Sequence, residues 1–353
     1  MESVTMAKIF IYPANNHENQ YINIQENAIK KAGVDVTYSL KDFFSTDFLL
    51  LNWFETLGGN PKLDYLKKCI KIFLFVLLQK KIFWVVHNKQ PHAKYSNDPS
   101  IKLSVKLMKK LLKISSRIII LCDETLSVLN NLSKDDSFYC KKIYKIPHPN
   151  YIGVYPQSED LKNTDGLNFL YVGQVNKYKN VDLLINVFNE LQQENVFLTI
   201  AGNCKDNNYV TELKSTIKNK NICCDFRFIP DEELVSYINK SDILVLPYSL
   251  ESSLNSGTIF LAFSYGKTVI SPLIGTLKEY GSNNSFFYTY EYDTFEEHDN
   301  QLRATIKKVL ADYSTNPELI RKKGMQAYNY VAEHNSLDTI TALYNELFSQ
   351  FEQ

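Results

Sequence analysis

Short runs of apolar residues alternate with stretches of helical character along most of the chain. Strands that are buried on both faces of a sheet read as such runs. A strand–helix–strand order at this spacing predicts parallel strands with helices on both faces, a doubly wound α/β fold. The predicted strands are Lys8–Tyr12, Val34–Thr37, Phe48–Trp53, Ile82–His87, Arg117–Cys122, Lys142–Ile146, Phe169–Val172, Val196–Ala201, Asp242–Leu246 and Thr268–Ile270. The predicted helices are Gln25–Lys31, Tyr65–Leu78, Ile101–Lys113, Val181–Gln192, Asp231–Asn239 and Thr258–Tyr265.

The chain has 353 residues, which is too long for one core of ordinary size. A polar stretch, Pro156–Asp165, separates two strand–helix series. We therefore expect an N-terminal domain over residues 1–153 and a C-terminal domain over residues 154–330. Residues 331–353 have helical apolar spacing, and we expect them to form a helix that packs back toward the N-terminal domain.

Several common motifs are absent from the sequence. No Gly-x-Gly-x-x-Gly follows the first strand and no phosphate-binding P-loop motif occurs, which argues against a dehydrogenase and a P-loop enzyme. The six cysteines lack zinc-binding spacing and favour reduced thiols in a cytoplasmic protein. The apolar run Ile72–Leu78 is much shorter than the roughly 20 residues that span a bilayer. Residues 1–5 do not resemble a secretion signal.

Positive charge is concentrated between Pro61 and Ile120, although the whole chain has equal numbers of basic and acidic residues. This stretch holds fourteen basic residues against two acidic ones. The two helices predicted within it are amphipathic and lysine-rich, as is typical of helices on anionic lipid, while solvated surface helices are the alternative. One lysine face consists of Lys102, Lys106, Lys109, Lys110 and Lys113. Nucleic acid is not an expected partner, because base recognition favours arginine and the chain has four.

Three loops in the C-terminal half suit a bound diphosphate, and each follows a predicted strand. Ligands of doubly wound sheets bind beyond the carboxyl ends of the strands. Gly173–Asn180 supplies a glycine and two lysines, which favour an anion. Pro247–Thr258 ends in small residues at a helix start, where backbone N–H groups are open. Ser271–Glu279 is the third loop, and we expect all three at one edge of the sheet.

Residues 169–280 resemble the C-terminal domain of GT-B glycosyltransferases and are close to glycosyltransferase family 4. The matching segments are Gly173–Lys179, Ile200–Gly202, Ile229–Leu234, Ser241–Pro247 and Ser256–Ile270. In the N-terminal half, His87–His92 and Ile146–Tyr151 look like segments of bacterial surface-polysaccharide transferases. The resemblance implies two Rossmann-like doubly wound domains that face a central cleft.

The chain departs from the family pattern at three positions. Gln174 stands where the family usually has arginine, while the usual lysine is kept as Lys179. Ser253 and Leu261 stand where the family has a pair of glutamates, the second of which typically holds the ribose hydroxyls. Candidates for sugar or ribose contacts in their place are Glu251, Asn255 and Glu279.

The resemblance implies transfer of a hexose-type sugar from a UDP- or GDP-sugar, with no required metal or other cofactor. Lys179 and the helix start at Ser256–Gly257 would stabilise the departing diphosphate. The candidate donor-binding residues are Gly173, Gln174, Lys177, Lys179, Ile229, Ser256, Gly257 and Thr258. His87 is the catalytic candidate through contact with the sugar, with proton transfer a weaker option and a structural histidine the alternative. The acceptor candidates are Asn15, Asn16, His17 and His92.

The N-terminal domain is expected to take the acceptor, a polyprenyl-diphosphate-linked glycan of bacterial capsule, exopolysaccharide or O-antigen assembly. The lysine-rich helices would then hold the enzyme on the anionic inner face of the plasma membrane. Two alternatives stay open. A sugar-nucleotide epimerase of the same architecture would show catalytic carboxylates, and a non-catalytic sugar-binding module would fit the missing glutamates.

Overall fold

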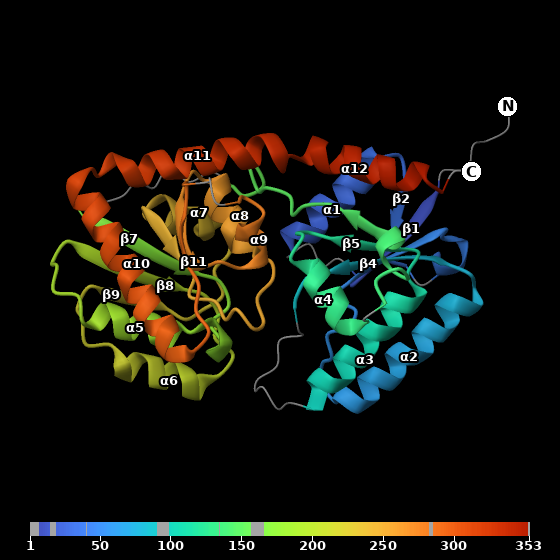
Figure 1. The fold of residues 1–353 in the computed structure, drawn as a ribbon, viewed down its shortest axis with the longest axis horizontal. Helices are drawn as coiled ribbons and strands as arrows, with labels where there is room; N and C mark the ends of the chain where they lie inside the picture. The colour runs from blue at the N-terminus through green and yellow to red at the C-terminus, as the bar shows by residue number, and fades with distance from the viewer. Residues whose placement is uncertain are drawn as a thin grey trace. The chain divides into compact units, whose positions relative to one another are not determined.

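The computed structural model describes residues 7–14, 19–39, 41–89, 99–133, 135–156, 166–281 and 285–351. The chain forms two compact units (Figure 1). Unit 1 consists of Met1–Pro149, Glu251–Asn255 and Asn335–Gln353, and unit 2 consists of Asn150–Leu250 and Ser256–His334. Each unit is built on one six-stranded sheet in which all neighbouring strands are parallel.

The sheet of unit 1 has the order β2-β1-β3-β4-β5-β6. Its strands are β1 (Lys8–Tyr12), β2 (Asp35–Thr37), β3 (Phe48–Asn52), β4 (Lys81–Val86), β5 (Arg117–Ile120) and β6 (Ile143–Lys145). Its helices are α1 (Gln20–Lys31), α2 (Pro61–Leu77), α3 (Pro99–Ile114), α4 (Thr125–Leu132) and α12 (Leu337–Ser349).

Both faces of this sheet are covered, and alternate residues of one strand therefore enter different cores. Leu49 and Leu51 of β3 pack with residues of α2 and α3. Phe48 and Leu50 of the same strand pack with residues of α1 and α12. This two-sided burial explains why β3 reads as an unbroken apolar run in the sequence.

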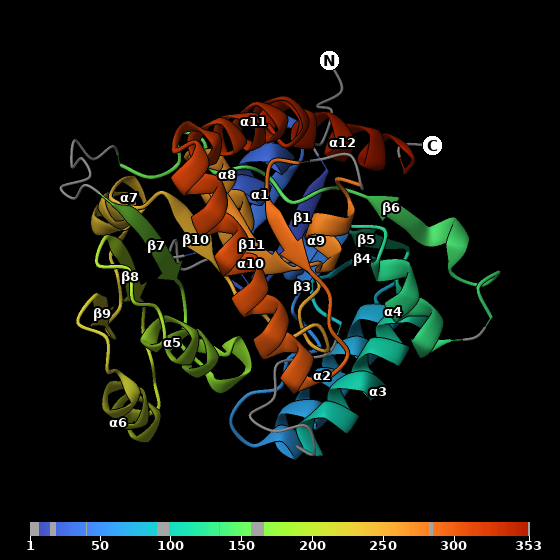
Figure 2. The ribbon, with the colours of Figure 1, turned by 60° about the vertical axis from the view of Figure 1, so that its left-hand side comes forward.

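The sheet of unit 2 has the order β12-β11-β10-β7-β8-β9. Figure 2 shows β7, β8, β9, β10 and β11 from a second direction. Its strands are β7 (Leu167–Val172), β8 (Val196–Ala201), β9 (Ile222–Asp225), β10 (Ile243–Val245), β11 (Thr268–Pro272) and β12 (Tyr288–Tyr290). Its helices are α5 (Val181–Asn189), α6 (Asn207–Thr216), α7 (Asp231–Asn239), α8 (Gly257–Ser264), α9 (Gly275–Lys278), α10 (Phe295–Thr315) and α11 (Glu318–His334).

The predicted fold class is confirmed, since both units are doubly wound α/β structures. β1, β8 and α7 have the predicted bounds, whereas α5 ends at Asn189 and not at Gln192. β9, β12, α4, α6 and α9 are present in the structure but were not predicted from the sequence. In the described ranges, no helix is both long enough and apolar enough to cross a membrane.

Candidate functional site

The loop after β7 begins with a close approach of two backbone segments in unit 2. Gly173 and Gly202 have φ values of 131° and 147°, which side chains rarely adopt. A Cβ atom on Gly202 would lie 1.8 Å from the carbonyl oxygen of Gly173, so only glycine fits there. A Cβ atom on Gly173 would lie 3.8 Å from Oγ1 of Thr258, at the start of α8. The β7 loop therefore runs beside the N-terminus of α8.

Lys179 ends a short 3₁₀ turn, Lys177–Lys179, that leads into α5. The next residue, Asn180, adopts the left-handed conformation and donates a 2.8 Å hydrogen bond from Nδ2 to the carbonyl oxygen of Pro247. This bond ties the β7 loop to the chain that follows β10. Nζ of Lys179 lies 3.9 Å from the centroid of the Tyr248 ring, a cation–π contact.

No carboxylate in the described ranges pairs with Lys179. Burial lowers the pKa of Lys179 to about 8. A nearby anion would favour the charged form and raise that pKa. The described neighbours of Lys179 therefore do not neutralise its positive charge, and the phosphate of a ligand would do so.

Tyr248 links Lys179 to the start of α8. Its hydroxyl lies 3.0 Å from Oγ of Ser256, the residue that precedes the helix. The Ser256 N–H donates to Oγ1 of Thr276 at 3.2 Å, and the Ser256 side chain does not cap the helix. The first N–H groups of α8, at Gly257 and Thr258, have no acceptor within the helix and carry its partial positive charge. A half-buried cation and an uncapped helix N-terminus therefore both lie next to Tyr248.

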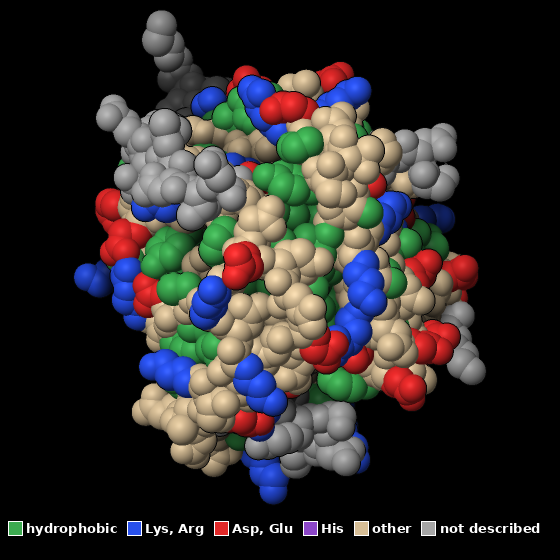
Figure 3. All heavy atoms as spheres, turned by 90° about the vertical axis from the view of Figure 1, so that its left-hand side faces the viewer, with side chains coloured by type: hydrophobic (Ala, Val, Ile, Leu, Met, Phe, Trp, Pro, Cys, Tyr) green, Lys and Arg blue, Asp and Glu red, His purple; other side chains and the backbone are tan. Residues whose placement is uncertain are grey.

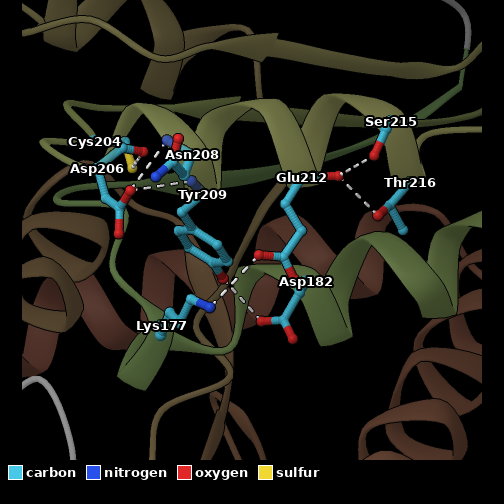
Figure 4. Close-up of polar contacts among 9 residues, drawn as sticks. All are labelled: Lys177, Asp182, Cys204, Asp206, Asn208, Tyr209, Glu212, Ser215 and Thr216. Atoms are coloured by element: carbon cyan, nitrogen blue, oxygen red, sulfur yellow. Dashed lines mark hydrogen bonds and ion pairs between the residues drawn. The ribbon is translucent and has the colours of Figure 1, made fainter.

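Lys177 has different surroundings from Lys179, although both belong to the same turn. Figure 4 shows Lys177 directed toward Glu212 of α6, with 3.5 Å between Nζ and Oε2. Nζ of Lys177 also lies 5.4 Å from the centroid of the Tyr209 ring, whose hydroxyl donates to Asp182 at 2.9 Å. The side chains of Lys177 and Glu212 are both 58% exposed. The structure therefore separates the two lysines that sequence analysis had grouped together.

The remaining donor candidates lie around this loop cluster or outside it. Gln174 is exposed, and its carbonyl oxygen accepts a 2.8 Å hydrogen bond from Tyr171. Ile229 is half-buried between β9 and α7, and Glu279 is half-buried directly after α9. Glu251 and Asn255 belong to the segment that is part of unit 1. The donor and ribose roles of these residues stay predictions.

His87 lies in a buried chain of hydrogen bonds within unit 1. Gln25 donates from Nε2 to the Tyr344 hydroxyl at 2.7 Å, and Asn52 donates from Nδ2 to Oε1 of Gln25 at 2.8 Å. This leaves Oδ1 of Asn52 to accept from Nε2 of His87, at 2.9 Å. All four side chains are buried.

The His87 ring also stacks on Trp53, with 3.9 Å between centroids. Burial lowers the pKa of His87 well below its ordinary value, and the neighbouring His148 lowers it further. His87 is therefore neutral near pH 7 and donates from Nε2, an arrangement that favours the structural alternative. Contact of His87 with a sugar stays a prediction.

The acceptor candidates Asn15, Asn16, His17 and His92 lie outside the described residues. The five membrane candidates of α3, Lys102, Lys106, Lys109, Lys110 and Lys113, are all exposed. Within the described ranges, no cluster of three or more His, Cys, Asp or Glu side chains is arranged to hold a metal ion.

Tyr248, Thr276 and Tyr292 are not among the site residues predicted from the sequence. The Tyr292 hydroxyl donates to the carbonyl oxygen of Tyr248 at 3.0 Å and accepts from the N–H of Leu250 at 2.9 Å, which fixes the loop after β10. Tyr248 and Thr276 lie in two of the three loops that follow predicted strands, Pro247–Thr258 and Ser271–Glu279, so their positions were a usable signal. Tyr292 carries no such signal.

The chain is similar to known proteins in sequence and in fold. Residues 157–324 match the family model described as glycosyl transferases group 1. The GDP-mannose:glycolipid 4-beta-D-mannosyltransferase of Xanthomonas campestris pv. campestris is 22% identical over 293 residues, which cover 79% of this chain and 78% of that protein.

Two solved structures share the fold across almost the whole chain. HepE of Anabaena, in complex with UDP-glucose, has a TM-score of 0.71 at 11% identity and covers 98% of this chain and 100% of that one. The sucrose-phosphate synthase of Thermosynechococcus elongatus has a TM-score of 0.74 at 14% identity and covers 98% and 99%.

Proposed function

Because this chain is a glycosyltransferase of the GT-B fold, with a glycosyl transferases group 1 domain at residues 157–324, we propose that it moves a hexose from a nucleoside diphosphate sugar to a lipid-linked glycan. The donor binds to unit 2, in the loop cluster of Lys179, Tyr248 and the start of α8. One observation carries this assignment: Lys179 lies against Tyr248, whose hydroxyl contacts Ser256 at the uncapped start of α8.

The chemistry of this cluster suits a leaving diphosphate. Breaking the bond between the sugar and the diphosphate places additional negative charge on the phosphate oxygens. The Lys179 ammonium and the N–H groups of Gly257 and Thr258 stabilise that charge, because they are already positioned when the reaction occurs. Gly173 has no side chain and leaves its backbone open beside Thr258. The diphosphate raises the pKa of Lys179, so the lysine keeps its proton and acts as a fixed cation.

The names of the relatives support the choice of donor and acceptor. One relative is named for GDP-mannose and a glycolipid, and HepE is seen with UDP-glucose. We therefore propose a UDP- or GDP-hexose as donor and a polyprenyl-diphosphate-linked glycan as acceptor, in the assembly of a bacterial surface polysaccharide. Such an acceptor places the enzyme at the cytoplasmic face of the plasma membrane, where the five exposed lysines of α3 meet anionic lipid.

The full chain should be incubated with a panel of radiolabelled UDP- and GDP-sugars, with and without a lipid extract that contains polyprenyl-linked glycans. We expect label to move from one sugar nucleotide into the lipid fraction. Conversion of the donor to its epimer would identify an epimerase, and binding without turnover would identify a sugar-binding module. Either of these two results overturns the proposal.

A pair of variants connects the assay to the site. Lys179→Met should abolish most of the transfer, and Lys177→Met, which removes an exposed ion pair of the same turn, should leave transfer nearly unchanged. Equal losses in the two variants would show that the diphosphate is not held as proposed.

A further inference from the structure

Helix α2 has two apolar faces on opposite sides. Ile72 and Phe75 are buried in the core of unit 1. The other face points away from that core and follows steps of three and four residues, the spacing of one helical side. This outer face of α2 consists of Leu63, Leu66, Ile70, Phe73, Leu74 and Leu77, each between 44% and 65% exposed.

Such exposure is concentrated on this helix. Of the thirteen large hydrophobic side chains that are exposed in the described ranges, seven belong to α2. The view in Figure 3 shows a different pattern on a face that carries elements of unit 2, where hydrophobic, basic and acidic side chains are intermingled. A contiguous apolar strip on a protein surface marks a place where another apolar phase or molecule binds.

Lysines border the outer face of α2. At 100° per residue, Lys67 and Lys71 lie along one flank and Lys62 lies along the other, and all three are exposed. The one acidic residue of the helix, Asp64, is engaged by Lys68 at 3.4 Å and by the N–H of Gly58 at 3.0 Å.

An exposed aromatic ring lies near the C-terminal end of α2. Phe44 is 72% exposed, and its carbonyl oxygen accepts a 2.8 Å hydrogen bond from Nζ of Lys80. Its neighbour Phe43 packs on Phe75 of α2, with 5.6 Å between ring centroids. An aromatic side chain next to a lysine at the end of an apolar face is typical of a segment that lies at a lipid–water boundary.

Helix α3 packs beside α2 and differs from it in one respect (Figures 1 and 2). Its apolar residues Leu107, Met108, Leu111 and Leu112 are buried, and its five lysines are exposed. The two helices therefore differ in their exposed side chains. α3 exposes lysines but none of its described large apolar side chains, and α2 exposes an apolar face with lysines on both flanks.

We propose that the outer face of α2 inserts into the headgroup region of an anionic bilayer, with the exposed lysines of α2 (Lys62, Lys67 and Lys71) and of α3 bound to lipid phosphates. Charge complementarity selects this occupant. A second copy of the same face would bring Lys62, Lys67 and Lys71 close to their own equivalents, whereas anionic lipid neutralises them. α2 has 17 residues and buries Ile72 and Phe75 in the core of unit 1, so it lies along the protein surface with its outer face exposed.

The biological purpose of this membrane contact, access to a lipid-linked acceptor, rests on the proposed function. The experiment that tests the contact does not. The outer face belongs to unit 1, whereas the donor cluster belongs to unit 2. Vesicle binding needs neither donor nor acceptor. Failure of vesicle binding therefore leaves the donor assignment intact, and failure of sugar transfer leaves the lipid assignment intact.

The full chain should be sedimented with vesicles of phosphatidylglycerol and phosphatidylcholine in equal parts, and with vesicles of phosphatidylcholine alone. We expect binding to the anionic vesicles and a decrease at high salt. A triple variant, Ile70→Gln, Phe73→Gln and Leu77→Gln, should lower the partition coefficient on the order of a hundredfold. Phe228→Gln is the matched control, because Phe228 of unit 2 is 64% exposed and Phe73 is 65% exposed. The control should bind like the unaltered protein.

The depth of the helix can be measured separately. Tryptophan introduced as Phe73→Trp should be quenched by brominated lipid, and Phe228→Trp should not. Three results would overturn the proposal: no binding of the unaltered protein to anionic vesicles, binding by the triple variant equal to that of Phe228→Gln, or absence of quenching in vesicle-bound Phe73→Trp. A dimer in lipid-free solution that the triple variant dissociates would assign the face to a second copy and would also overturn it. A far-ultraviolet circular dichroism spectrum and an unfolding temperature equal to those of the unaltered protein show that the triple variant is folded.

Discussion

At the carboxyl end of β4 in unit 1, His87 belongs to a closed chain of hydrogen bonds that runs through Asn52 and Gln25 to Tyr344. At the carboxyl end of β7 in unit 2, Lys179 lies on the face of Tyr248 without a carboxylate partner in the described ranges. Both edges belong to six-stranded parallel sheets of the same architecture. The difference lies in whether the polar side chains form hydrogen bonds and ion pairs with one another. A satisfied network holds a fold together, and an unpaired cation beside a helix N-terminus suits an anion, as we propose for the donor diphosphate.

The largest effect that would test this contrast is loss of the Lys179 charge. Lys179→Met should lower kcat on the order of 10²–10³-fold, because it removes a preorganised positive charge from the leaving diphosphate. Transfer assays at saturating donor would measure it, with Lys177→Met as the control. An unchanged kcat in Lys179→Met would show that the edge of unit 2 does not stabilise the leaving group.

Replacement of His87 tests the other edge. His87→Leu leaves Oδ1 of Asn52 buried without a donor, which should lower the free energy of unfolding of unit 1 by about 1–3 kcal/mol. Hydrogen exchange in β3 and β4 would measure the change, and His334→Leu, at an exposed histidine of α11, is the control. Unchanged exchange with a large decrease in kcat would instead assign His87 to the sugar.

Donor affinity should depend on pH through Lys179. Its pKa is about 8 without ligand, lowered by burial. The cationic form binds the diphosphate, so affinity is full below that pKa and decreases as the pH rises through it. The dissociation constant of the nucleoside diphosphate should increase roughly tenfold between pH 7 and pH 9. Isothermal titration calorimetry would measure it, and the same dependence in Lys179→Met would exclude Lys179 as its source.

The smallest predicted effect concerns one hydroxyl group. Tyr248→Phe keeps the ring under Lys179 and removes the hydrogen bond to Ser256, so donor affinity should fall by about 0.5–1.5 kcal/mol. Tyr209→Phe removes a comparable hydroxyl beside Lys177 and should leave donor affinity unchanged. A larger loss in Tyr209→Phe than in Tyr248→Phe would reverse the assignment of the two lysines.

The sequence predicted the sheets well where strands are apolar and buried on both faces. β1 has its predicted bounds for this reason, and its three central residues are buried. β8 also has its predicted bounds, although Phe197 and Thr199 are only half-buried. β9 was missed because Ile222–Asp225 contains two cysteines and an aspartate, and it lies at the edge of its sheet. α6 was missed because it buries only Tyr209 and Leu213, which is too few residues for a clear helical period.

The candidate site was predictable as a set of loops but not in its internal contacts. Lys177 and Lys179 are two residues apart, and no local pattern distinguishes them. Their difference depends on Glu212 and Tyr248, which the fold brings to them from other elements. The same is true of α2 and α3, which have similar patterns in sequence and differ in which apolar residues the core covers.

Helix α12 has a consequence for how the protein is made. Its Tyr344 hydroxyl accepts a hydrogen bond from Gln25, which lies 319 residues earlier, and its side chains complete one core of unit 1. Translation proceeds from the N-terminus, so the six strands of unit 1 leave the ribosome long before α12, the helix that covers part of one face of their sheet. Unit 2 is complete before α12 has been synthesised. We therefore expect unit 1, whose synthesis begins before that of unit 2, to complete its folding after unit 2. Until then one face of its sheet is partly uncovered, and chaperones would protect it.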